Sequence, residues 1–86
     1  MASTSVNIHN NSDKAIHAKL LWAASLIGEV RIQPRSSGQI GCEYVWYDLF
    51  ILDNNDGKDL CKSLGIYGHT TCEVVNENGK YLVRRY

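Results

Sequence analysis

The chain has 86 residues and a formal net charge of zero, because nine Lys and Arg residues balance nine Asp and Glu residues. A domain of this size buries roughly 60–65% of its unfolded surface, which allows one small core and excludes a two-lobed enzyme. Hydrophobic residues make up 44% of the chain and charged residues 21%, which excludes an intrinsically disordered protein. The lack of net positive charge argues against nucleic acid and anionic membranes, which attract their partners over long range.

From these residues we predict no segment that directs the chain into or across a membrane. The N-terminus has no basic stretch followed by an apolar one, so no secretory signal is predicted. The longest apolar runs, 20–24 and 49–52, are far shorter than the roughly 20 residues of a membrane helix. We expect a soluble protein that is cytoplasmic or released without a signal peptide. Cys42, Cys61 and Cys72 form no C-x-x-C pair, and we expect reduced, partly buried thiols, with one disulfide and one free thiol as the alternative.

Alternating apolar residues, interrupted by segments rich in Asn, Asp, Gly and Ser, predict strands and turns in the first half of the chain. A second strand is predicted near residues 15–24, and a helix over 14–24 is the alternative. The pattern breaks at 25–28, and a turn is predicted at 34–38. A first strand is predicted from Val6 and Ile8, and a short third strand from Val30 and Ile32. Ile40 and Cys42 alternate in the segment that follows the turn.

Two hairpins are predicted in the second half. The Asp56-Gly57 and Asn78-Gly79 steps tolerate the positive φ of a tight hairpin turn. If Asn78-Gly79 is a two-residue turn, opposite charges gather on one face of the hairpin and apolar residues on the other, which supports this register. The facing pairs are then Glu73 with Arg84, Val74 with Val83, and Glu77 with Lys80.

Seven or eight short strands predict an all-β fold, a small single-domain antiparallel β-sandwich over residues 1–86, with a compact barrel as the alternative. The strand over residues 44–53 is apolar on both faces, and an exposed apolar face invites aggregation. We therefore expect a homodimer or larger homo-oligomer. The two alternating sets of apolar residues in the strand over 44–53 are Trp46, Phe50 and Leu52 on one side, and Val45, Tyr47, Leu49 and Ile51 on the other.

Catalytic motifs are absent from the sequence. His69 and Cys72 lie three residues apart, and on a strand they project to opposite faces, so they do not form a Cys-His catalytic pair. The chain has no nucleophile elbow, zinc-protease helix, phosphate loop or dinucleotide fingerprint. We expect a protein that is not an enzyme and needs no cofactor.

Metal binding is also weakly supported. If the first two strands form a hairpin, His9 lies across from His17, but two imidazoles without a further ligand make a weak site. The oxygen-rich run 53–59 lacks the spacing of a calcium loop, and a hairpin turn explains it. We therefore predict no metal.

The C-terminal segment interleaves cations with tyrosines, as strands that stack nucleic-acid bases do. Glu73 and Glu77 lie opposite this segment and neutralise it. We therefore predict a charged, solvated face and no nucleic-acid partner.

Carbohydrate is the partner that the composition favours. Five tyrosines and two tryptophans supply rings for the apolar faces of sugars, and turn residues supply groups that pair with hydroxyls. Residues 65–70 are predicted to form a loop that presents Tyr67 and His69, with a structural turn as the alternative. Tryptophan on an alternating strand is more often a core residue than a ligand platform, which favours burial of Trp22 and Trp46. The candidate ligand-binding residues are Tyr67, His69, Asn54, Asp56, Trp46 and Tyr47.

Three short motifs carry a partial resemblance to known families: the strand end Ile8-x-Asn10-Asn11-Ser12, Trp22 at the close of the second strand, and Ile32-x-Pro34 with Ser37-Gly38 before Ile40. On these motifs, residues 6–40 resemble small β-sandwich proteins of the aegerolysin and actinoporin-like group and lectins of the fungal type. The resemblance implies a sandwich and admits a lipid- or membrane-active role.

We therefore expect a non-catalytic carbohydrate-binding protein, a lectin, that acts as an oligomer so that several weak sites bind together. One alternative is a membrane-binding or pore-forming β-sandwich. The other is a structural or protein-interaction module.

Overall fold

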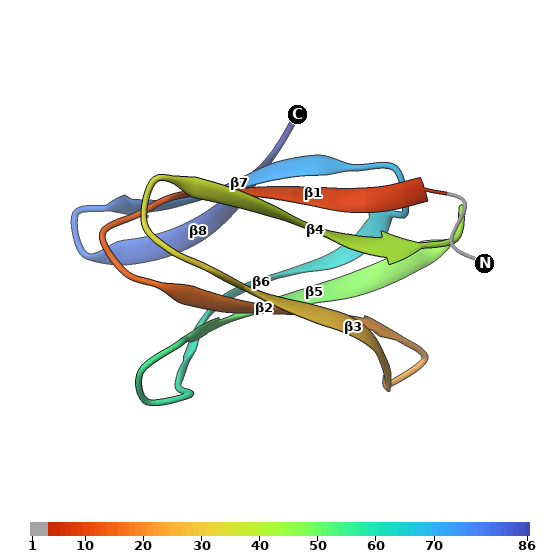
Figure 1. Ribbon diagram of the computed structural model, residues 1–86, viewed down its shortest axis with the longest axis horizontal. Coiled ribbons are helices and arrows are strands. Elements are labelled where there is room, and N and C mark those ends of the chain that lie inside the picture. Colours follow the sequence, from red (N-terminus) through yellow and green to blue (C-terminus); the bar gives the residue numbers. More distant parts are fainter. Residues whose placement is uncertain (1–3) are drawn as a thin grey trace.

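The structure is a computed structural model that describes residues 4–86 as two packed four-stranded β-sheets (Figure 1). The strands are β1 (Thr4–Asn11), β2 (Ile16–Trp22), β3 (Ser25–Ile32), β4 (Ser36–Cys42), β5 (Trp46–Asp53), β6 (Asp59–Tyr67), β7 (Thr71–Glu77) and β8 (Lys80–Arg85). The first sheet has the order β4-β1-β7-β8, and the second has the order β3-β2-β5-β6. The predicted small all-β sandwich is confirmed.

β1 lies inside the first sheet, between antiparallel β4 and parallel β7. The prediction of a wholly antiparallel sandwich is therefore wrong at the β1–β7 pair. The chain leaves β1 for β2 in the opposite sheet and returns beside β1 first in antiparallel β4. It reaches the other side of β1 in β7, which starts at the same end of the molecule as β1. The predicted first hairpin is also wrong, because His9 belongs to the first sheet and His17 to the second.

The core lies between the sheets and takes alternate residues of the strands. In β2, Ile16, Ala18 and Leu20 are fully buried, whereas His17 and Lys19 are partly exposed. This period of two, together with pairing to β3 and β5 on either side, excludes the helix alternative for this segment. The core side chains are Val6, Ile8, Ile16, Ala18, Leu20, Ile32, Ile40, Cys42, Tyr47, Leu49, Ile51, Ile66, Cys72 and Val74.

β3 begins earlier than the sequence pattern predicts. A tight turn at Ala23 (φ 49°) and Ala24 (φ 66°) joins β2 to β3, which starts at Ser25. The register shifts next to Leu21, and this irregularity disturbs the alternation that marks a strand. The predicted break at residues 25–28 is therefore wrong, and this segment is paired with β2.

The hairpin of β7 and β8 is confirmed in turn and register. Asn78 and Gly79 both have positive φ, at 56° and 85°. The predicted pairs are all present: Glu73 faces Arg84, Val74 faces Val83, and Glu77 faces Lys80. The ion pair of this face joins Glu77 to Arg84 rather than joining two directly facing residues.

The outer side of β5 is covered in part by its neighbours. On the inner side, Tyr47, Leu49 and Ile51 are buried in the core, whereas Val45, the fourth residue of that predicted set, is exposed. On the outer side Phe50 is half-buried, and its register partners on both flanking strands are lysines, Lys19 and Lys62. The aliphatic stems of lysines can cover apolar surface. The homo-oligomer stays a prediction.

The three cysteines are free thiols in the described structure. Cys42 and Cys72 are buried, and Cys61 is half-buried. Burial raises the pKa of both Cys61 and Cys72 to about 11. Within residues 4–86 the structure has no helix with the length and hydropathy to cross a membrane.

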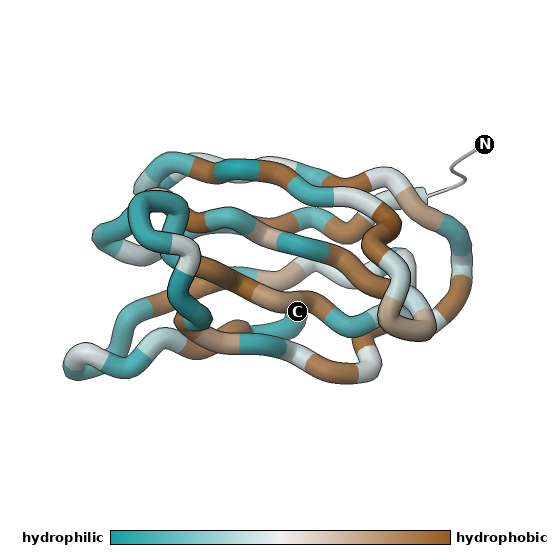
Figure 2. Tube along the Cα trace, turned by 90° about the horizontal axis from the view of Figure 1, so that it is seen from below, coloured by the Kyte–Doolittle hydropathy of each residue, from teal (hydrophilic) through white to brown (hydrophobic). Residues whose placement is uncertain are grey.

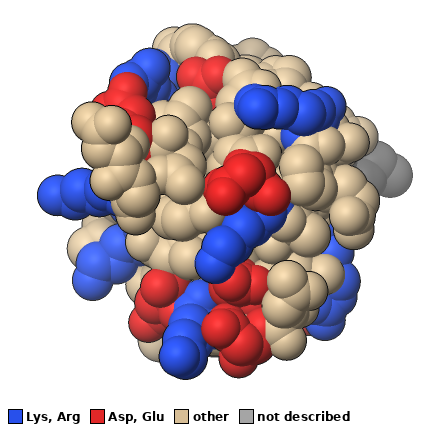
Figure 3. All heavy atoms as spheres, turned by 90° about the vertical axis from the view of Figure 1, so that its left-hand side faces the viewer, with Lys and Arg blue, Asp and Glu red and all other residues tan. Residues whose placement is uncertain are grey.

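The two ends of the long axis differ in character. The connections at residues 12–15, 33–35, 54–58 and 78–79 gather at what we call the polar end, on the left of Figure 1. Hydrophilic loops dominate this end in Figure 2, and in Figure 3 charged side chains of both signs are spread over it among uncharged residues. The opposite, apolar end carries the connections at 23–24, 43–45 and 68–70. Eight large exposed hydrophobic residues belong to strands and connections at or near it: Trp22, Leu26, Ile27, Tyr44, Val45, Trp46, Leu64 and Tyr67.

Candidate functional site

Four ring-bearing side chains form an aromatic cluster at the apolar end, which consists of Tyr44, Trp46, Tyr67 and His69. Trp46 meets Tyr67 edge to face, with ring centroids 5.1 Å apart. The Tyr44 ring lies 6.2 Å from Tyr67 and 5.9 Å from His69. Trp46 is 63% exposed. The structure thus brings together three predicted ligand residues, which are Trp46, Tyr67 and His69.

Strand pairing places the two central rings side by side. Trp46 and Tyr67 are directly opposite on antiparallel β5 and β6, so they project from the same face. The register shifts between Tyr47 and Asp48, which marks a bulge. In the bulge Gly65 has φ +72°, a conformation that favours glycine, and its N–H donates to Asp48 Oδ1 at 3.0 Å. The bulge bends the end of β6 at the cluster.

A second glycine lets the two connections next to the ring-bearing residues touch each other. The Gly68 N–H donates to the Val45 carbonyl at 2.9 Å. A Cβ at Gly68 would lie 1.9 Å from the Glu43 carbonyl oxygen, so only glycine permits this approach. The glycines on either side of Tyr67 therefore have different structural roles, one in a bulge and one in a close backbone contact.

His69 is held against the first strand. Its Nδ1 lies 2.8 Å from Thr4 Oγ1, which orients the ring beside Tyr44. The structure differs from the predicted loop over residues 65–70, because Tyr67 is the last residue of β6 and His69 lies in a short turn before β7. Trp46 and Tyr67 are therefore presented by paired strands, which are more rigid than a loop, whereas Tyr44 and His69 lie in the adjoining connections.

Arg85 at the end of β8 ties the two sheets together beside the cluster. Its guanidinium donates to Ser63 Oγ through Nε at 3.1 Å and Nη2 at 2.9 Å. It also donates to the Leu64 carbonyl at 2.9 Å and to the Gly65 carbonyl at 3.4 Å. The bulged backbone that carries the rings is therefore fixed from the opposite sheet.

A shallow groove of about 390 Å³ adjoins the cluster, since residues 43–47 contribute to both. Trp22 is 52% exposed along it, and the expectation that Trp22 and Trp46 lie in the core is wrong. The groove lining is Trp22, Ile27, Gly41, Cys42, Glu43, Val45 and Tyr47.

Tyr47 is a core residue in the structure. It is 4% exposed, and its hydroxyl accepts the Glu43 N–H at 2.9 Å. The side chain therefore fixes the connection before β5 from inside and offers only a small edge to the groove. Its inclusion among the ligand residues is not supported by this position.

The predicted ligand residues Asn54 and Asp56 lie at the polar end, beyond the far end of β5. The length of that strand separates them from Trp46 by roughly 23 Å. Asn54 Oδ1 accepts from Arg31 at 2.7 Å, and Asp56 Oδ1 accepts the Lys58 N–H at 2.9 Å. The structure does not bring these residues to the aromatic cluster.

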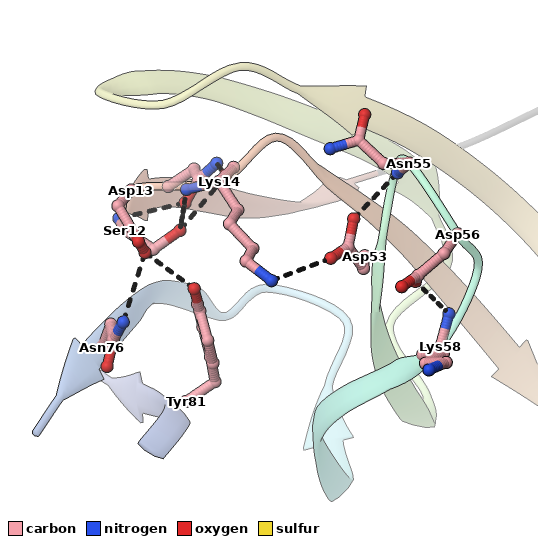
Figure 4. A network of polar contacts seen from close by, with 10 residues as sticks. Ser12, Asp13, Lys14, Asp53, Asn55, Asp56, Lys58, Asn76 and Tyr81 are labelled. Carbon is pink, nitrogen blue, oxygen red and sulfur yellow. Dashed lines mark hydrogen bonds and ion pairs between the residues drawn. The ribbon is translucent and has the colours of Figure 1, made fainter. Parts of the chain in front are cut away.

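Side chains at the polar end are engaged with one another (Figure 4). Asp53 accepts the Asn55 N–H at 2.8 Å and the Lys14 ammonium at 3.1 Å, and these two contacts lower the pKa of its carboxyl. Asp13 accepts from Tyr81 at 2.7 Å and Asn76 at 3.2 Å, which lowers the pKa of Asp13. These groups stabilise turns.

The histidines of the two sheets have separate partners. His9 Nδ1 lies 2.5 Å from Ser37 Oγ, and His17 Nε2 lies 2.5 Å from Glu29 Oε1. Among residues 4–86, no three His, Cys, Asp or Glu side chains group closely enough to hold a metal ion. The oxygen-rich run 53–59 forms the turn between β5 and β6.

Sequence reasoning missed Tyr44 as a member of the cluster. Tyr44 is two residues before Trp46, so alternation would have placed both side chains on one face. The same parity separates both of them from Val45 and Tyr47, which line the groove and the core. This spacing was the signal available in the sequence.

Comparisons with known proteins inform only the fold. No family model and no curated protein matches the chain. Among solved structures, it is similar to the C-terminal domain of AlgF from P. aeruginosa, with a TM-score of 0.61 and 19% identity over 99% of this chain and 97% of that one. This neighbour supports the sandwich. It is neither an aegerolysin nor a fungal lectin, and the resemblance to those families stays a prediction.

Proposed function

We propose that this protein binds neutral carbohydrate, without catalysis, on the aromatic cluster of Tyr44, Trp46, Tyr67 and His69. The observation that carries this proposal is the exposed ring of Trp46, 63% accessible and held edge to face by Tyr67. Sugars present apolar C–H faces that pack on aromatic rings, and their hydroxyls need hydrogen-bonding groups at the rim.

The rim of the cluster supplies such groups. Tyr44 and Tyr67 carry phenolic hydroxyls, which both donate and accept. The His69 ring lies beside Tyr44, and its contact with Thr4 sets its orientation. Rings on a paired strand lose little side-chain entropy when a ligand arrives, which favours binding.

The cluster is open, so one site contacts one side of a sugar and binds weakly. Weak single sites gain strength when several act together. The proposal therefore includes assembly of the protein into a homo-oligomer that acts as a lectin. Size-exclusion chromatography with light scattering at high micromolar concentration checks this part, and a monodisperse monomer contradicts it.

A glycan array followed by calorimetry tests the binding itself. We expect retention on neutral glycans that free monosaccharide competes away. Trp46→Ala should weaken binding at least tenfold, about 1.4 kcal/mol, with little change in thermal midpoint, because its ring is largely outside the core. Tyr67→Ala should weaken it similarly.

Tyr86→Ala is the matched control. Tyr86 is also an exposed tyrosine, at 74%, but it follows β8 and is not a member of the cluster. The control should bind glycans as the unaltered protein does. Silence on the array, or equal binding by Trp46→Ala, removes the aromatic cluster as a sugar site.

A further inference from the structure

The tip of the hairpin that joins β2 and β3 is apolar and uncharged. Residues 20–28 contain no charged side chain. Trp22, Leu26 and Ile27 are all exposed there, and Leu26 is 50% accessible. Val45 is exposed on the neighbouring connection and lines the same groove as Trp22 and Ile27.

The turn at this tip uses residues that its backbone does not favour. Ala23 and Ala24 have φ of 49° and 66°, and Asn78 and Gly79 at the polar end have φ of 56° and 85°. Asn and Gly are the preferred residues for two successive positive φ angles, whereas the alanine Cβ makes them unfavourable. The same molecule therefore builds one turn with suitable residues and the other with apolar ones.

The interior of the protein does not require those two methyl groups. Ala23 and Ala24 are both exposed at the tip, and neither belongs to the core. The tip keeps apolar residues although their backbone conformation is unfavourable and the core does not need them. This combination indicates contact with an apolar medium outside the molecule.

We propose that this hairpin tip, together with Val45, inserts into the interface of an uncharged phospholipid surface. Trp22 lies at the tip and Tyr44 is exposed next to Val45 in the sequence, and Trp and Tyr favour the boundary between headgroups and acyl chains. The groove lining contains no Lys or Arg, so the groove itself offers anionic headgroups no attraction. This proposal is independent of sugar binding.

The size of the apolar end argues against a second copy as its occupant. Across the long axis the Cα trace measures 23 by 19 Å, so an end-to-end contact spans about 440 Å², roughly half of the ~800 Å² per partner in a stable interface. A lipid surface has no such minimum area, because shallow insertion scales with the apolar area buried.

Vesicles of phosphatidylcholine test the proposal. In a Trp46→Phe background, Trp22 is the single tryptophan, and its emission should shift to shorter wavelength when vesicles are added. The protein should float with the vesicles, and replacing a third of the lipid with phosphatidylserine should leave the partition coefficient unchanged within twofold. Leu26→Asp with Ile27→Asp should lower partitioning at least tenfold.

The matched control adds the same two charges at the opposite end. Asn55→Asp with Asn78→Asp should partition as the unaltered protein does. Both positions are exposed in polar-end turns. A loss of partitioning in this control as large as in the tip variant contradicts insertion by the tip.

A second tip variant separates binding from folding. Ala23→Asn with Ala24→Gly should raise the thermal midpoint, because it relieves the unfavourable φ, and should lower vesicle partitioning several-fold. No partitioning of the unaltered protein, partitioning that requires phosphatidylserine, or partitioning that the tip variants leave unchanged overturns the proposal. Self-association that the tip variants abolish, without lipid binding, overturns it in favour of a second copy.

Discussion

The two ends of this sandwich are built by the same eight strands, and backbone bonds close turns at both, but polar side chains take a larger part at one end than at the other. At the polar end, side chains accept backbone N–H groups: Asn10 from Ser12, Asp53 from Asn55, Asp56 from Lys58, and Asn76 from Gly79. At the apolar end, the connections are joined by backbone bonds from Val45 to Glu43, Gly68 to Val45, and Thr70 to Tyr67, and two side chains accept backbone N–H groups, Tyr47 from Glu43 and Asp48 from Gly65.

This difference indicates that the polar end contributes mainly to stability and the apolar end mainly to binding. The polar side chains at one end are occupied with holding the fold. At the other end fewer polar side chains take part in the turns, and large apolar and aromatic side chains face solvent. Substitutions at the polar end should therefore act on stability, and substitutions of exposed rings at the apolar end should act on binding.

The largest expected effect comes from Asn10→Ala. Asn10 is 1% exposed, donates to the carbonyls of Lys14 and Ile32 at 2.7 and 3.0 Å, and accepts from Ser12. Its loss leaves several buried groups unpaired, and we expect about 3 kcal/mol less stability in urea denaturation. Tyr44→Ala, the comparison at the apolar end, should cost about 0.5 kcal/mol or less. Equal losses of stability in the two variants contradict the assignment of stability to the polar end.

A smaller effect is expected from Gly68→Ala, which should alter both properties. The new Cβ collides with the Glu43 carbonyl, so the connections next to the ring-bearing residues must separate, at a cost of about 2 kcal/mol. The affinity for sugar, measured by calorimetry, and the stability, measured by urea denaturation, should both decline. Gly57→Ala at the polar end has φ +75° and open space, so it should cost about 1 kcal/mol and leave binding intact.

The pH dependence should originate largely at the polar end. The Asn55 N–H and the Lys14 ammonium lower the pKa of Asp53 below its usual 3.8, so the stabilisation is present above that value and is lost as pH falls through the folded pKa. Urea midpoints between pH 5 and 2 should fall less steeply in Asp53→Asn. A parallel decline of variant and unaltered protein contradicts this assignment.

The smallest expected effect concerns the reactivity of the thiols of Cys61 and Cys72, which lie within strands. With pKa values of about 11, Cys61 and Cys72 are thiolate in roughly one molecule in 1,000 at pH 8. Iodoacetamide should label them slowly in the folded protein and quickly in urea, as followed by mass spectrometry. Rapid labelling of the folded protein contradicts this degree of burial.

Local chemistry explains which features the sequence could predict. Asn78-Gly79 specifies both its turn and its register, so the last hairpin followed from two residues. Ala23-Ala24 gives no turn signal, and β3 was therefore cut short. In β5 both alternating sets are apolar, and nothing local shows that Tyr47 faces the core and Trp46 faces solvent.

Features made by distant segments were beyond sequence reasoning. The pairing of β1 with β7 joins residues more than sixty positions apart. The aromatic cluster was predicted in part because Trp46, Tyr67 and His69 are suitable residue types, but its assembly depends on the Gly65 bulge and the β5–β6 register. Asn54 and Asp56 were suitable types at the wrong end.

The position of β1 between β4 and β7 has a consequence for the order of folding. In the second sheet, β2 with β3 and β5 with β6 are consecutive hairpins, so β5 and β6 can pair with little loop-closure cost. The first sheet is incomplete until residues 71–75 return to β1, and such non-local pairing is slow. We expect the strands that carry Trp46 and Tyr67 to pair early, while one side of β1 stays open as a site for mispairing until β7 closes it.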